Sequence, residues 1–145
     1  MSIKIIKEVS QKRRFIGRLN TKADLLKSIT DICTEKRITL GVFSIVGAIK
    51  KAKLGYYNQN KKKYVGDMVF NKKMEITSCI GNISLKDGKV FVHAHITLAD
   101  KKGKCFGGHL MPGTQVFAAE FYIEELRGTV LKRKNDASTG LSLWA

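Results

Sequence analysis

The chain has 145 residues and a mass of 16.2 kDa, which is the size of a single domain with one core. Hydrophobic residues make up 43% and charged residues 27%, and this balance excludes a disordered chain, a collagen-like chain and a disulfide-rich miniprotein. The net charge of +15 favours a polyanionic partner, of which nucleic acid is the commonest, although lysine greatly outnumbers arginine. We find no apolar run long enough for a membrane span and no signal peptide, and we expect a cytoplasmic protein.

In chain order, residues 13–19 are a short strand candidate, and a helix is predicted over residues 22–36. Thr21 fits the N-cap position, and Asp24 three residues later gives a weak form of the capping box. The helical period is carried by five apolar residues that share one face: Leu25, Leu26, Ile29, Ile32 and Cys33.

The remainder of the chain is typical of strands separated by polar turns, and Asp87-Gly88 is its strongest hairpin signal. One helix beside about seven largely antiparallel strands predicts an α+β fold, a single domain over residues 1–145 with the helix packed on a strongly twisted sheet. One helix leaves part of such a sheet uncovered, and an uncovered face often becomes a subunit interface. The strand candidates after the helix are residues 40–53, 64–70, 74–85, 89–98, 104–110, 116–125 and 128–133.

Three histidines lie close together in this strand region. His93 and His95 share one face of a strand, about 6.6–7 Å apart, because side chains alternate. A three-residue loop, Lys101-Lys102-Gly103, places His109 opposite His95, and Gly103 suits the left-handed position that ends such loops. A two-residue loop would instead turn His109 to the opposite face.

With the three-residue loop, three imidazoles lie on one face of the sheet, and they form a ligand set for zinc or for another divalent transition metal. Cys105 has the same strand parity as His109 and could supply a fourth ligand. The alternative is that each histidine is structural and hydrogen-bonded. The three cysteines, Cys33, Cys79 and Cys105, form no CxxC pair, and we expect them to be small buried residues rather than disulfides.

Two carboxylates, Glu75 and Glu120, fall within strand-like apolar runs, and a buried carboxylate needs a partner. We expect a structural ion pair with Arg18 or Arg133, with support of a histidine ligand as the alternative. We find no Ser–His–Asp order, P-loop, GxGxxG or HExxH motif, so the sequence does not favour an enzyme.

Basic turns could form a rim that binds DNA, or they could be charged hairpin tips that limit edge aggregation. Their residues are Lys61, Lys62, Lys63, Lys72, Lys73, Lys101 and Lys102.

A set of short sequence blocks extends over nearly the whole chain. These blocks are Arg18-Leu19, Asp24-Leu25, Ile45-Val46-Gly47-Ala48, Ala52-Lys53-Leu54-Gly55-Tyr56-Tyr57, Met74-Glu75-Ile76, Gly81-Asn82-Ile83, His93-Ala94-His95-Ile96, Gly107-Gly108-His109-Leu110, Gly113, Glu120, Arg133 and Gly140-Leu141. Together they resemble the PPC (plants and prokaryotes conserved) domain family in its single-domain prokaryotic form. The resemblance implies an antiparallel α+β fold, a homotrimer and a metal site at the three histidines. Prokaryotic members are described as candidate DNA-binding proteins, but the AT-hook of the plant relatives is absent from this sequence.

Two hypotheses therefore remain open. The first is a trimeric DNA-binding or regulatory protein that binds weakly selectively through its lysines and carries a histidine metal site. The second is a metal-dependent sensor of a small ligand, or a zinc enzyme, built on the same three histidines.

Overall fold

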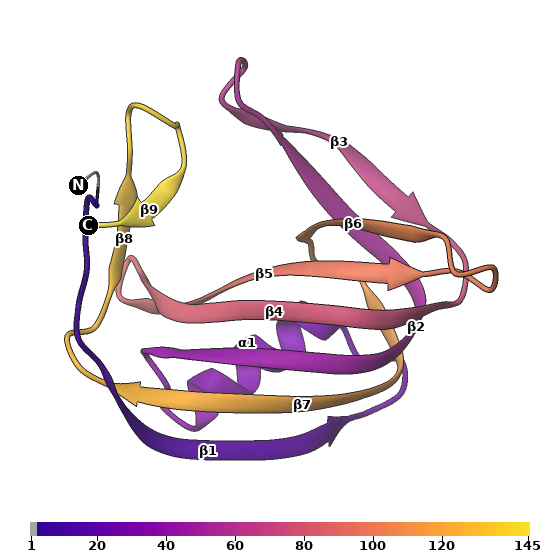
Figure 1. Ribbon diagram of the computed structural model, residues 1–145, viewed down its shortest axis with the longest axis horizontal. Coiled ribbons are helices and arrows are strands. Elements are labelled where there is room, and N and C mark those ends of the chain that lie inside the picture. Colours follow the sequence, from indigo (N-terminus) through magenta and orange to yellow (C-terminus); the bar gives the residue numbers. More distant parts are fainter. Residues whose placement is uncertain (1–2) are drawn as a thin grey trace.

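The computed structural model describes residues 3–145 and has one α-helix and a mostly antiparallel sheet, as predicted (Figure 1). Within these residues the sheet has nine strands rather than about seven. The strand that was not predicted from the sequence is β9, and the segment expected at 128–133 becomes a strand only at Lys132, as β8. The elements are β1 (Ser10–Leu19), α1 (Leu25–Glu35), β2 (Gly41–Asn58), β3 (Lys63–Phe70), β4 (Met74–Lys86), β5 (Lys89–Ala99), β6 (Cys105–Leu110), β7 (Gln115–Arg127), β8 (Lys132–Asn135) and β9 (Ser142–Trp144).

The long strand β2 organises the sheet because its two halves have different partners. Its first half pairs with β7 on one side and β4 on the other, and its second half pairs with β3 and β6. The partners change between Lys51 and Ala52. Gly47 lies in the first half, where φ is 141° and a Cβ would lie 2.2 Å from the carbonyl oxygen of Ala118. Only glycine fits so close to the neighbouring strand β7.

Helix α1 covers one face of the sheet through Leu25, Ile29 and Cys33, which are fully buried. Its N-cap is Asp24 rather than the predicted Thr21: the Asp24 carboxylate accepts a hydrogen bond from the Lys27 backbone N–H at 2.9 Å. Thr21 instead donates to the carbonyl of Phe117 at 2.8 Å, so its hydroxyl is committed to β7. None of the helices in the described residues is long and apolar enough to span a membrane.

The sheet face opposite α1 carries apolar side chains in solvent. Ile16 is 85% exposed, Ile80 62% and Val46 54%. The registers place Ile16 opposite Tyr122, Tyr122 opposite Ser44, and Ser44 opposite Ile80. We call the face that bears Ile16, Val46 and Ile80 the outer face.

Candidate metal centre

The three histidines come from two adjacent strands, and their pairing follows the predicted register. His95 on β5 lies directly opposite His109 on β6, and Gly103 in the connecting turn has φ 79°. Asp100 fixes this turn, since its carboxylate accepts hydrogen bonds from the backbone N–H groups of Lys102 and Lys104 at 2.9 and 3.1 Å. The three-residue loop therefore places all three imidazoles on one face.

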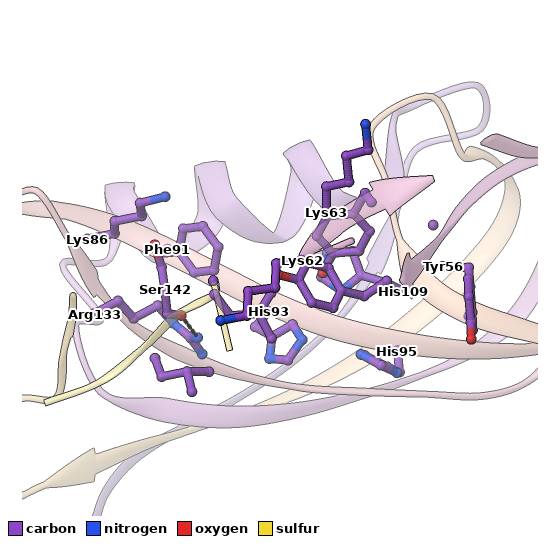
Figure 2. Close-up of a pocket in the computed structure, with 17 residues that line it drawn as sticks. Tyr56, Lys62, Lys63, Lys86, Phe91, His93, His95, His109, Arg133 and Ser142 are labelled. Carbon is purple, nitrogen blue, oxygen red and sulfur yellow. Dashed lines mark hydrogen bonds between the residues drawn. The ribbon is translucent and has the colours of Figure 1, made fainter. Parts of the chain in front are cut away.

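The imidazoles form a compact cluster (Figure 2). The ring centroids of His93 lie 5.1 Å from those of His95 and of His109, and the His95–His109 separation is 5.4 Å. One nitrogen from each ring lies within 4.8 Å of the others. His95 is exposed, whereas His93 and His109 are half-buried. Cys105 is not part of this cluster, and it is exposed rather than buried.

Burial keeps two of these histidines neutral. It lowers the pKa of His93 to about 4, with smaller contributions from Arg133 and His95. Burial likewise lowers the pKa of His109 to about 4, helped by His93, His95 and Arg133. The buried Nδ1 of His109 also has no hydrogen-bond partner. Neutral imidazoles with an unpartnered nitrogen are suitable donors for a metal ion, so the residues fit the group that their pattern predicts.

The cluster lies in the wall of a cavity of about 690 Å³. Tyr64 packs against His109 with ring centroids 5.0 Å apart, and Tyr57 contacts the Tyr64 ring edge-on at 5.1 Å. The hydroxyl of Tyr57 donates to the carbonyl of Thr139 at 2.7 Å, which ties this wall to the C-terminal segment.

Arg133 on β8 forms the opposite part of the wall and is only 8% exposed. Its guanidinium donates to Ser84 Oγ, Asn82 Oδ1 and the carbonyl oxygen of Ser142, each at 2.9 Å. It also lies over the rings of Phe91 and Trp144, at 4.9 and 5.7 Å from their centroids. The sequence predicts Arg133 as an ion-pair partner of a carboxylate, whereas the structure places it beside the histidines with neutral acceptors. The sequence signal for its burial is the alternation of Arg133 with exposed Lys132 and Lys134.

The expected ion pairs of Glu75 and Glu120 are not found. Both carboxylates and Arg18 are exposed, and the salt bridges among residues 3–145 do not join any of them to Arg133. Their strands have one face in solvent, so an apolar sequence neighbourhood did not imply burial. Among the side chains that the structure describes, the buried carboxylate is that of Glu125, which accepts hydrogen bonds from Lys12 at 2.8 Å and from Arg13.

The basic turns form two groups rather than one rim (Figure 1). Lys61, Lys62 and Lys63 lie at the tip of the β2–β3 hairpin, and the Lys62 ammonium donates to the carbonyl of Ala137 at 2.9 Å. The other group joins two turns, because Lys72 reaches the Asp100 carboxylate at 3.4 Å. That second group contains Lys72, Lys73, Lys101 and Lys102.

Comparisons with known proteins agree with this architecture. The family model of the Plants and Prokaryotes Conserved (PCC) domain matches residues 6–127. A metal-containing protein from Archaeoglobus fulgidus is 38% identical, with a TM-score of 0.92 over 97% of this chain and 99% of that one. A plant- and prokaryote-conserved (PPC) protein from Pyrococcus horikoshii is 36% identical, with a TM-score of 0.91 over 97% and 96% of the two chains.

Two further matches are to another solved structure and to a much longer protein. A candidate DNA-binding protein from Bacteroides thetaiotaomicron is 30% identical, with a TM-score of 0.84 over 94% of this chain and 96% of that one. The bifunctional protein GlmU of a Synechococcus strain is 30% identical over 125 residues, or 85% of this chain. The match spans only 18% of the length of that relative.

Proposed function

Because the chain belongs to the Plants and Prokaryotes Conserved (PCC) domain family, we propose that it holds one divalent metal ion through His93, His95 and His109, with zinc as the first expectation. The observation that carries this proposal is the cluster itself, in which three imidazole nitrogens lie within 4.8 Å of one another. The buried Nδ1 of His109 supports it, because buried ring nitrogens normally have a partner and a bound ion would supply one.

Such an ion would supply Lewis-acid chemistry at the wall of the cavity. The chain's own contribution is to hold the three imidazoles close together and, through burial, to keep those of His93 and His109 neutral. Zinc ligands with bonds of about 2.0–2.1 Å lie about 3.4 Å apart in a tetrahedral site, so the rings must close in slightly. His95 is exposed and has the freedom to turn toward the two half-buried rings.

The test is metal analysis of protein purified without a histidine tag, for the wild type and for single alanine substitutions of the three histidines. We expect about one ion per chain in the wild type and a loss of most of it in each variant. Thr97→Ala is the matched control, since Thr97 lies two residues from His95 on the same face of β5 and outside the cluster. A wild type that binds no zinc, cobalt, nickel or iron would overturn the proposal.

We also propose a homotrimeric assembly through the outer face, which the exposed Ile16, Val46 and Ile80 support. Light scattering should give three times the 16.2 kDa chain mass, and a monomer at micromolar concentration would contradict this. Three chains would carry a formal charge of +45, so salt should strengthen the assembly.

A third proposal is weakly selective DNA binding, supported by the net charge of +15 and by the two lysine groups. Each phosphate neutralised should contribute about −0.9 to the slope of log K against log salt, so engagement of Lys61, Lys62 and Lys63 alone gives about −3. Methionine at these three positions should flatten the slope by that amount. No duplex binding near 50 mM salt would overturn the proposal.

A further inference from the structure

The cavity beside the histidines has an excess of positive charge. Its wall contains Arg133, Lys62, Lys63 and Lys86, and none of the lining residues that the structure describes is Asp or Glu. Three neutral imidazoles cannot offset the charge of a divalent ion. A loaded site would therefore place that charge beside a buried guanidinium, an arrangement that requires an anion for compensation.

Arg133 retains hydrogen-bonding capacity for such an anion. A guanidinium has five N–H groups, and three are used by Ser84, Asn82 and Ser142. The side chain is held rigidly by these bonds and by the Phe91 and Trp144 rings. Asn82, which accepts one of the bonds, pairs directly with His93 across β4 and β5, so Arg133 is attached next to the histidine cluster.

The rest of the cavity wall suits the carbon skeleton of an organic molecule rather than a bare inorganic ion. Tyr57, Tyr64 and Phe91 provide aromatic surface, and the volume of about 690 Å³ lies within the range of small-molecule sites. Figure 2 places Arg133, Phe91 and Lys86 on one side of His93, and His109 and Tyr56 on the other.

We propose that this cavity binds a small organic anion, whose carboxylate or phosphate group lies between Arg133 and the histidine-held metal and whose body contacts Tyr57 and Tyr64. The inference rests on the proposed metal site. Arg133 is a binding residue here, and Lys63 and Lys86 attract the anion at the mouth of the cavity. Arg133 and the part of the wall at residues 141–143 lie outside residues 6–127, so the C-terminal segment supplies part of the ligand site.

The test uses protein loaded with Co²⁺, whose visible spectrum reports its ligands, and four probes: phenyl phosphate, inorganic phosphate, benzoate and acetate. We expect at least one aromatic probe to change the Co²⁺ spectrum and to bind about fivefold or more tightly than its small counterpart. The phosphate and carboxylate arms identify which oxyanion is preferred. Metal-free protein should bind the preferred probe about tenfold more weakly or worse.

The variants test the geometry. Arg133→Lys should weaken binding of the preferred probe about tenfold or more, because lysine lacks the fork and the remaining N–H groups. The double variant Lys63→Met/Lys86→Met should weaken it about fivefold. The matched double control, Lys61→Met/Lys132→Met, removes the same charge from residues that do not line the cavity and should change it less than about twofold.

The outcomes separate the two proposals. If Co²⁺ does not bind, the metal site itself is wrong, and this inference fails with it. If Co²⁺ binds through the histidines but no probe alters its spectrum at about 1 mM, the metal site stands and the anion site is overturned. Equal weakening by both lysine double variants would also overturn it, even if Arg133→Lys did not fold.

Discussion

Replacement of Arg133 by methionine should loosen the C-terminal hairpin from the main sheet. The side chain donates three hydrogen bonds of 2.9 Å, two to β4 side chains and one to the β9 backbone. Hydrogen bonds to a charged group are worth about 1.5–3 kcal/mol each, which gives about 4.5–9 kcal/mol before desolvation. Returning the guanidinium to water on unfolding offsets several kcal/mol of this, so we expect a net loss of about 2–4 kcal/mol.

For a chain of this size, that loss corresponds to a fall in Tm of about 5–15 °C, measured by calorimetry. The chain has a single tryptophan, Trp144, and its ring lies 5.7 Å from the Arg133 guanidinium. Its fluorescence therefore reports directly on this contact, and the emission of the variant should shift to the red before global unfolding.

Lys134→Met is the matched control, because Lys134 is the exposed neighbour on the same strand. It should change the Tm by no more than about 2 °C. An Arg133→Met protein with unchanged tryptophan emission and a Tm within about 2 °C of the wild type would refute the reasoning, because the arginine would then not hold the hairpin.

Three further results are expected. Gly47→Ala should destabilise the protein by more than about 3 kcal/mol in urea titrations, because its Cβ would lie 2.2 Å from a β7 carbonyl oxygen. Gly103→Ala has open space around its Cβ and should cost only about 1–2 kcal/mol of backbone strain. Equal losses of stability in the two variants would refute the close approach at Gly47. Burial lowers the pKa of His93 and His109 from 6.5 to about 4, so unfolding of metal-free protein takes up protons between these pH values. The free energy of unfolding should therefore be highest above pH 6.5 and fall toward pH 4. His109→Gln should flatten this pH dependence. Ile80→Asp should lower the mass in light scattering from the proposed trimer to the monomer without changing the circular dichroism spectrum, and an unchanged mass would place the interface elsewhere.

The histidine cluster could be predicted from the sequence because it depends on local rules. Strand alternation places His93 and His95 together, and the turn that ends at Gly103 determines the position of His109. The helix and its apolar face also followed from spacing, although its N-cap is Asp24 rather than Thr21.

The Arg133 side of the cavity could not be predicted, because it depends on long-range packing. Arg133 meets Ser84 and Asn82 from about fifty positions away, and only the parallel pairing of β8 with β4 brings them together. The exposure of Glu75 and Glu120 was missed for the same reason, since sequence alone does not tell which face of a strand another element covers.

The order of strands has a consequence for synthesis on the ribosome. Within residues 3–145, β1 pairs with β7 alone, and β7 begins at Gln115, long after β1 ends at Leu19. At about 5–20 residues per second, β1 must wait roughly 5–20 s for its partner to emerge. Charged side chains on an unpaired strand oppose its pairing with other chains, and β1 carries four of them: Lys12, Arg13, Arg14 and Arg18.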